Sequence, residues 1–551
     1  MAKNPKSYTA VLYFHGIGNP RRHVSLAQFL DYFDRFGQDQ RKEEIGKPRD
    51  FEYGCERFGS EDIVNFVKFK RVITVKGEPR VAKNIRAYEG YWVPEAGNRA
   101  GLVFILTWLI RRLFNPTVVL FSRWRSFPGL RLSHLHRMIG YKISQRKAQL
   151  LERSYRDFEN WESRSEFKNG GFGEFFNFLN QRRSELIFPA QKWWKQFVKY
   201  NLILNLYVYT ITICATLMVW ITFSSIYNIA IKIYTEQSGT LDHSIFVDYS
   251  TIIVSTTIIL YAYLKGDTYV FDVISWTADT ERGENFQTRD RIVKYSQRLI
   301  RHITSDPNCE ACVVIGHSLG TCIATEALLR EGRLALASEL PESNEIVDAL
   351  RKVKHVFTIG SPIDRIFYIF QADSSFSHRY SRLFEEQRLS VQLPPFTLPG
   401  HDNGARIINF WSRFDPISST IFSLRKNASD RRDVITNRES VPKGIPLPIR
   451  SHTSYFSDRS VMKPIYWSIM AGKLPKDFDA KHELSTVLPA FGLPSVAITL
   501  CLFTWLIWSL IYWSSPILSV AITVSWLAII TGQRWLTIRR HVLRHGKYVQ
   551  R

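Results

Sequence analysis

The stretch ACVVIGHSLGTCIATEALL, residues 311–329, decides the fold of this chain. A short apolar run at 312–315 leads directly into Gly-His-Ser-Leu-Gly at 316–320, and a segment with small residues on one helical face follows. This order predicts a strand, a sharp turn and a helix, with Ser318 at the turn. Glycines fit both ends of such a turn, because side chains there would collide with the neighbouring strand or helix.

The turn matches the pattern G-x-S-x-G, in which a serine hydroxyl projects from the edge of a sheet as a nucleophile. The amide of Leu319 would then open a helix and face a developing oxyanion. The pattern alone can arise by chance, but its place between an apolar strand and an alanine-rich helix favours a catalytic Ser318. His317 is expected to point away from the serine face and to shape the turn.

A second glycine-rich turn lies near the start of the chain. Residues 8–14, YTAVLYF, predict a strand that runs into His-Gly-Ile-Gly at 15–18. Glycine lets the backbone turn so that the amide of Ile17 can point at a substrate carbonyl oxygen. Ile17 and Leu319 are therefore the predicted oxyanion donors.

A serine hydroxyl becomes a good nucleophile only when a base takes its proton, and an acid must orient that base. Asp415 follows a strand predicted at 406–411, and His452 lies in a later loop. The order Ser–Asp–His is typical of one class of hydrolases, so we predict a Ser318–His452–Asp415 triad. The alternatives left open are Asp364 and Asp402 for the acid, and His378 and His401 for the base.

Four segments occur in an order that resembles the α/β-hydrolase superfamily of lipases and esterases. They are FHGIGNP at 14–20, GHSLG at 316–320, FDPIS at 414–418 and HTSYF at 452–456. The H-G-I-G turn is similar to that of small bacterial lipases. The resemblance implies an α/β-hydrolase fold, a mostly parallel sheet flanked by helices, and an ester or thioester hydrolase without a metal or organic cofactor. It covers residues 8–92 and 267–460, so the substrate class is not carried over from it.

Composition limits the classes of partner. The 551 residues carry a net charge of +23, which predicts attraction to a polyanion. Because the basic residues cluster beside apolar stretches, we expect anionic membrane lipids rather than nucleic acid as the partner. Six cysteines in this length do not form a disulfide scaffold. Cys309 and Cys312 form a C-x-x-C pair, but no second pair completes a zinc site, so we interpret both as buried packing residues.

Two long uncharged stretches predict membrane-spanning hairpins. Residues 200–231 carry no charge, and a second apolar run at 244–264 follows a short polar loop. Residues 484–533 also carry no charge and contain a Ser-Ser-Pro turn signal. Lysines flank the first hairpin and arginines follow the second, so the positive-inside rule puts the catalytic domain and both termini in the cytoplasm. We expect an integral protein of the inner or plasma membrane.

The segment at 101–153 is rich in Lys and Arg, has Glu152 as its only acid and interleaves aromatic residues and leucines. We interpret it as a surface that lies on anionic lipid, the alternative being an ordinary solvated basic face. The predicted organisation has a hydrolase domain in two parts, 1–96 and 266–483. The other parts are a basic, partly interfacial insertion at 97–199, hairpins at 200–265 and 484–533, and a basic tail at 534–551.

Further elements follow from periodicity and turn signals. Strands are expected at 70–75, 87–92 and 352–359, and helices at 26–36, with Ser25 as N-cap, and at 290–303. Loops are expected at 168–175, 367–403 and 436–451.

Together these observations predict a membrane-integral serine hydrolase that cleaves acyl esters of lipids through a covalent acyl-enzyme. Two alternatives remain open: a membrane-tethered esterase or thioesterase with a soluble substrate, and a non-catalytic membrane scaffold or sensor with a hydrolase fold.

Overall fold

A computed structural model places strands β1 (Tyr8–Phe14) and β5 (Cys309–His317) side by side at the centre of a sheet. Every residue of β1 is buried, and so is most of β5. The continuous apolar runs at 10–14 and 312–315 fit parallel strands that are covered by helices on both faces.

The structure describes residues 7–17, 21–41, 51–58, 62–73, 81–96, 172–188, 284–337, 343–363, 390–399, 404–412, 415, 417–421, 424, 434–440, 452–475 and 478, and seven isolated positions (154, 157, 191, 224, 227, 231 and 276).

Eight strands form one sheet in the order β2-β3-β4-β1-β5-β6-β7-β8. The six strands from β4 to β8 in this order are parallel, whereas β3 runs antiparallel to both β4 and β2. The remaining strands are β2 (Glu52–Phe58), β3 (Asp62–Ile73), β4 (Val81–Glu89), β6 (Val353–Ile359), β7 (Arg406–Trp411) and β8 (Ile435–Glu439).

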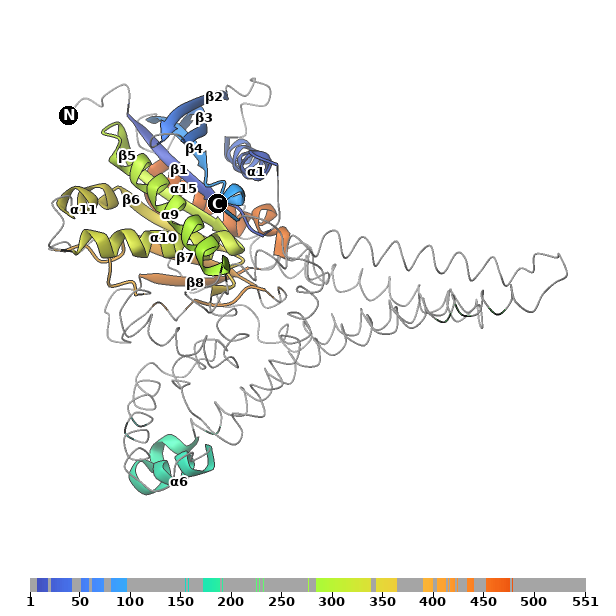
Figure 1. Cartoon of the computed structure of the whole chain (residues 1–551), viewed down its shortest axis with the longest axis vertical. Coiled ribbons are helices and arrows are strands. Elements are labelled where there is room, and N and C mark those ends of the chain that lie inside the picture. The colour runs from blue at the N-terminus through green and yellow to red at the C-terminus, as the bar shows by residue number, and fades with distance from the viewer. Residues whose placement is uncertain are drawn as a thin grey trace.

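Helices cover both faces of the sheet (Figure 1). One face packs against α9 (Glu284–Ser305), α10 (Leu319–Ala335) and α11 (Ser343–Arg351). The other packs against α1 (Val24–Arg41) and α15 (Arg459–Ala471). Side chains of β1 alternate between the two cores: Leu12 enters the first and Tyr13 the second. The expectation of an α/β domain with a mostly parallel sheet between helices is therefore confirmed.

The remaining elements are short. Helix α6 (Phe172–Arg182) starts inside the stretch 168–175, where a loop was expected, so that prediction was wrong from Phe172 onward. Single 3₁₀ turns occur at Val93–Ala96, Ser184–Leu186 and Tyr455–Ser457. The described part of the expected loop at 367–403, residues 390–399, contains turns and no helix.

Two element boundaries differ from the sequence prediction for a tertiary reason. Helix α1 begins at Val24, so Ser25 lies inside the helix and is not its N-cap. The backbone amide of His23 instead donates to Oε2 of Glu89, at 2.6 Å, from the end of β4. A carboxylate at a helix N-terminus also complements the helix dipole. The cap thus comes from a residue far away in the chain, which local pattern cannot reveal.

The stretch at 436–451, expected to be a loop, begins with strand β8. Residues Ile435–Glu439 pair in parallel with Ile407–Trp411 of β7. This strand has the polar sequence ITNRE, which carries no alternation of apolar and polar residues. Its conformation comes from hydrogen bonding to the edge of the sheet rather than from its own pattern.

Among the residues described, no helix has the length and apolar character needed to cross a bilayer. The expected hairpins at 200–265 and 484–533, apart from isolated positions in the first, lie outside the described residues. So do the basic tail at 534–551 and most of the insertion at 97–199.

Candidate active site

The carboxyl ends of four parallel strands meet at one edge of the sheet. β1 ends before His15 and Gly16, β5 ends at His317, β6 before Gly360, and β7 before Ser412. In open α/β sheets this edge is where ligands bind, because the loops that leave the strands converge there. Every predicted site residue except His452 follows one of these strand ends.

Ser318 occupies the sharp turn between β5 and α10. Its backbone has φ 53° and ψ −126°, a left-handed conformation that costs a non-glycine residue about 1–3 kcal/mol. Hydrogen bonds hold the turn: the Ser318 amide donates to the carbonyl of Ile359 at 2.9 Å. The Ser318 carbonyl accepts from the amide of Thr321 at 3.0 Å and from its hydroxyl at 2.7 Å. The predicted strand, turn and helix are confirmed here.

Both glycines of the turn are required by close packing. A Cβ atom on Gly320 would lie 2.4 Å from the carbonyl oxygens of Phe14 and His15, at the end of β1. A Cβ atom on Gly316 would lie 2.7 Å from Cα of Thr321. The glycines therefore let the first turn of α10 rest directly on β1 and β5.

The turn after β1 lies against the serine. A Cβ atom on Gly16 would come within 2.8 Å of Cβ of Ser318, and Ile17 follows Gly16 directly. The His15 carbonyl accepts a hydrogen bond from the indole of Trp92 at 3.3 Å, and the His15 ring stacks on that indole. Leu319 is the first residue of α10, where amides have no acceptor within the helix. Of the two predicted oxyanion donors, Leu319 thus follows Ser318 directly, and Ile17 follows the glycine that lies against Ser318.

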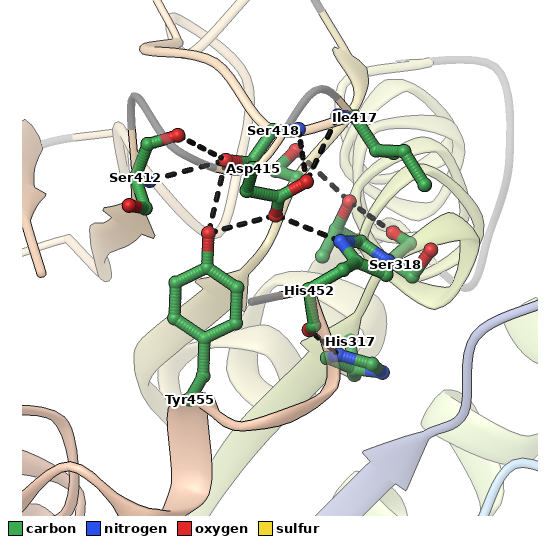
Figure 2. Close-up of polar contacts among 10 residues, drawn as sticks. His317, Ser318, Ser412, Asp415, Ile417, Ser418, His452 and Tyr455 are labelled. Carbon is green, nitrogen blue, oxygen red and sulfur yellow. Dashed lines mark hydrogen bonds and ion pairs between the residues drawn. The ribbon is translucent and has the colours of Figure 1, made fainter. Parts of the chain in front are cut away.

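Asp415 and His452 form a buried pair. Nδ1 of His452 donates to Oδ2 of Asp415 at 2.7 Å, and the two residues are 6% and 0% exposed. Figure 2 shows the imidazole ring between Asp415 and Ser318. The end of β6 lies against both Ser318 and His452. The carbonyl of Ile359 accepts from the Ser318 amide, and a Cβ atom on Gly360 would lie 3.1 Å from Cε1 of His452.

The second ring nitrogen of His452 is not used by the rest of the described structure. Nε2 is buried and has no hydrogen-bond partner among the described residues. Since Nδ1 donates to Asp415, Nε2 carries the lone pair of the neutral ring. Nε2 makes no hydrogen bond with the Ser318 hydroxyl here; general-base catalysis requires that contact, which often forms only when substrate binds.

Four donors surround the carboxylate of Asp415. Oδ1 accepts from the amides of Ile417 and Ser418 at 2.8 and 3.2 Å, while Oδ2 accepts from His452 and from the hydroxyl of Tyr455 at 2.8 Å. Burial by itself raises the pKa of Asp415, but the His452 charge and these hydrogen bonds outweigh it. The pKa of Asp415 therefore lies below its ordinary value, and the residue is an anion at neutral pH.

Two asparagines, the buried Asn409 and the half-buried Asn437, hold the loop that carries Asp415. Asn409 on β7 donates to the carbonyl of Ser419 at 2.9 Å and to Oδ1 of Asn437 at 2.8 Å. Asn437 on β8 in turn accepts from the amide of Ile421 and donates to its carbonyl, at 2.8 and 3.0 Å. The loop after β7 is thus folded back over β7 and β8, which fixes the acid in place.

His317 supports the loop of the base. Its Nε2 donates to the carbonyl of His452 at 3.1 Å, and its ring packs between those of His452 and Phe456. Burial, followed by the nearby His452, lowers the pKa of His317 to about 4, so the ring is neutral at physiological pH. The residue joins the end of β5 to the chain around His452.

The structure brings together five predicted residues: Ser318, Asp415 and His452, with Ile17 and Leu319 beside the serine. The alternatives Asp364, Asp402, His378 and His401 lie outside the described residues. Sequence reasoning assigned no role to Tyr455 and Ser418, although both belong to the segments HTSYF and FDPIS. The only signal in the sequence was that each hydroxyl lies three residues after the predicted acid or base. The contacts of these hydroxyls with the Asp415 site depend on the fold.

Other chemistry-bearing side chains do not form a second centre in the part of the chain that the structure describes. No group of His, Cys, Asp and Glu side chains there could hold a metal ion. Cys309 and Cys312 are free, buried thiols on β5. Burial raises the pKa of Cys309 to about 11 and that of Cys312 well above its ordinary value, so neither is a reactive thiolate.

Comparison of the chain with protein-family models, with curated proteins and with solved structures found no match.

Proposed function

We propose that this chain is a membrane-integral serine hydrolase that cleaves acyl esters of lipids through Ser318, His452 and Asp415. The observation that carries the proposal is the buried Asp415–His452 pair beside the strained serine, with Nε2 of His452 unused by any other described residue. A serine in the left-handed region costs stability, and such strain in a site with a base and an acid favours a catalytic role over a structural one.

In the proposed acylation step His452 acts first as a base and then as an acid. The Ser318 hydroxyl attacks the ester carbonyl carbon, and its proton passes to Nε2 of His452. The oxygen of the tetrahedral intermediate becomes an anion, which the amides of Ile17 and Leu319 stabilise. When the intermediate collapses, His452 gives the proton to the departing alcohol and Ser318 keeps the acyl group.

Deacylation repeats these roles with water as the nucleophile. His452 takes a proton from the water molecule, the acyl–oxygen bond to Ser318 breaks, and His452 returns the proton to the serine. Asp415 stays ionised in both steps and stabilises the imidazolium that forms each time. Its four hydrogen-bond donors support that role, because they favour the carboxylate over the neutral acid.

A lipid substrate is supported by the rest of the sequence. The uncharged stretches at 200–231 and 484–533 have the length and composition of bilayer spans, and the basic segment at 101–153 suits anionic headgroups. Anchored in this way, the site would lie at the cytoplasmic leaflet, where an acyl chain can enter directly. The order of serine, acid and histidine supports an α/β-hydrolase fold.

The proposal predicts covalent labelling of one serine. A fluorophosphonate probe should form an adduct on Ser318 of the full-length protein, and Ser318→Ala should remove both the adduct and the hydrolysis of ester substrates, by about 10³-fold or more. The matched control is Ser296→Ala, which removes another buried serine hydroxyl, one that bonds within α9, and should leave labelling intact.

The outcomes separate the possible activities. Release of fatty acid from anionic phospholipid vesicles by the wild type and not by Ser318→Ala supports the lipase. Labelling together with hydrolysis of soluble esters or thioesters only would replace the lipid substrate by a soluble one. Folded protein without an adduct on Ser318 would reject catalysis and leave a non-catalytic scaffold.

A further inference from the structure

Tyr455 touches the acid of the proposed triad on the same oxygen as the histidine. Its hydroxyl lies 2.8 Å from Oδ2 of Asp415, where Nδ1 of His452 lies at 2.7 Å. The same hydroxyl lies 2.9 Å from Oγ of Ser418, and all of these groups are buried. Figure 2 shows the tyrosine approaching the carboxylate from the side opposite the serine.

The chemistry of the contacts fixes the direction of these hydrogen bonds. An ionised carboxylate can only accept, so Tyr455 must donate its single proton to Asp415. The contact between Tyr455 and Ser418 is a hydrogen bond when the serine donates, and the single proton of Ser418 is shared between Tyr455, at 2.9 Å, and the carbonyl of Ser412, at 3.1 Å. Oγ of Ser418 also accepts from the amide of Ser412 at 3.1 Å, which orients this hydroxyl. The result is a chain from Ser412 through Ser418 and Tyr455 that ends on Asp415.

Tyr455 also has a fixed position. It is fully buried, begins the 3₁₀ turn Tyr455–Ser457, and lies three residues after His452. A Cβ atom on Gly360 would lie 3.1 Å from its ring, so the glycine admits both the tyrosine and the histidine at the end of β6. One turn of chain therefore supplies the base and a second donor to the acid.

We propose that Tyr455, backed by Ser418, is a positioning residue that keeps Asp415 ionised and so sets the acid limit of the pH range in which Ser318 reacts. The inference rests on the proposed function and deepens it. Without the tyrosine hydroxyl the carboxylate would have one donor fewer, bind protons more strongly, and attract the imidazolium of His452 more strongly. Because of both effects, the Asp415–His452 pair would keep its extra proton up to a higher pH.

The other described titratable groups near the Asp415–His452 pair do not titrate in the pH range of the proposed acid limit. In the part of the chain that the structure describes, the titratable groups that touch Asp415 are His452 and Tyr455. His317 at the end of β5 and His15 after β1 lie further away, and burial lowers the pKa of each to about 4. Both are neutral wherever the site would work, so a shift of the acid limit reports on the Asp415–His452 pair.

The test is Tyr455→Phe in the full-length protein, with the rate of fluorophosphonate labelling of Ser318 followed against pH. Removing a hydrogen bond to a charged group should slow labelling about ten-fold on the plateau and move the acid limit upward by about one pH unit. Ser418→Ala should move it in the same direction by less, because Tyr455 keeps its proton on Asp415.

The control is Tyr466→Phe. Tyr466 is a buried tyrosine of α15 whose ring packs on Phe33 and Phe36, away from the strand ends. Its change should leave both the rate and the acid limit unaltered. Unchanged pH dependence in folded Tyr455→Phe would overturn the inference; should that variant not fold, an unchanged acid limit in Ser418→Ala would overturn it.

A second readout separates this inference from the proposed function. The Nδ1 proton of His452, held by Asp415, can be followed by proton NMR without any turnover. Suppose that the wild type is not labelled but the resonance of this proton changes with pH at a higher pH in Tyr455→Phe than in the wild type. The enzyme proposal then fails and the positioning role holds. If the wild type is labelled and the proton titrates identically in both proteins, the positioning role fails alone.

Discussion

At the residue scale, two buried carboxylates, those of Asp415 and Glu326, have lowered pKa values because donors or cations surround them. Asp415 has four hydrogen-bond donors and no exposed surface. Glu326 on α10 is 8% exposed and pairs with Arg289 of α9 and with Arg330 one turn later. Arg330 also contacts Asp290 at 2.6 Å, so charged side chains connect α9 with α10, the helix that follows the turn at Ser318.

Glu326 yields a prediction about the pH dependence of stability. Burial alone would raise its pKa, but Arg289 and Arg330 lower it to about 2. Because the folded pKa is depressed, this group stabilises the protein fully above about pH 4.5 and the contribution is lost as the pH falls toward about 2. Glu326→Gln should therefore lower stability by about 3 kcal/mol at neutral pH and flatten its decline in acid.

The measurement is the thermal unfolding midpoint of wild type and variant against pH. Asp348→Asn is the control, because Asp348 pairs with Arg351 on the exposed side of α11 and surface pairs contribute about 0–1 kcal/mol. Parallel pH curves for wild type and Glu326→Gln would contradict the assignment.

At the scale of elements, the site depends on how closely α10 approaches β1. The helix begins at Leu319, one residue after the serine, and its second residue rests on the carbonyls that end β1. That approach brings the turn at Gly16 and Ile17 against Ser318, so the nucleophile and the proposed oxyanion donors are positioned by a single contact between two elements.

Gly320→Ala should disrupt this contact. The added methyl group would meet backbone oxygens at 2.4 Å, and backbone cannot move aside as a flexible side chain can. We expect a loss of about 3 kcal/mol or more in stability and loss of Ser318 labelling in whatever protein still folds. Thermal midpoints and fluorophosphonate labelling of the same preparations test this.

Gly472→Ala is the matched control for that prediction. Gly472 ends α15 with φ 66°, and a Cβ atom there would have no neighbour within 4 Å. Its substitution should cost only the backbone strain, about 1–2 kcal/mol, with labelling kept. Equal effects of the two substitutions would contradict the predicted clash, because Gly320 lies in α10 without a positive φ and its substitution adds no left-handed strain.

At the scale of the whole molecule, the candidate site gathers residues from distant parts of the chain. His452 and Asp415 are 37 positions apart, and Ser318 precedes the acid by almost a hundred. The sheet is what unites them, because the parallel strands β1, β5, β6 and β7 release their loops at one edge.

The proposed membrane anchoring belongs to this scale. Two uncharged stretches of bilayer length predict that the full-length protein stays in membranes after washing with high salt or alkaline carbonate and leaves them only in detergent. Salt weakens charge attraction but not burial of apolar spans. Release by salt alone would restrict the attachment to the basic surface, and the hairpin prediction would then be wrong.

Elements with a local signature were predictable. β1 and β7 have the bounds expected from their apolar runs, and the expected helices at 26–36 and 290–303 lie inside α1 and α9. β4 ends at Glu89, whereas its strand was expected to reach residue 92. Strand β8 was missed because its residues are polar and its conformation depends on pairing with β7.

The sequence by itself determined the turn at Ser318, the glycine-rich turn after β1, and the order in which an acid and a histidine follow the serine. These features are local, because glycine conformation and the periodicity of apolar residues are written in adjacent positions. Only the tertiary structure decided that Asp415 pairs with His452, that Tyr455 shares the same carboxylate oxygen, and that Glu89 caps α1. Each of these contacts joins residues whose distance depends on the packing of several elements, and no spacing along the chain encodes that distance.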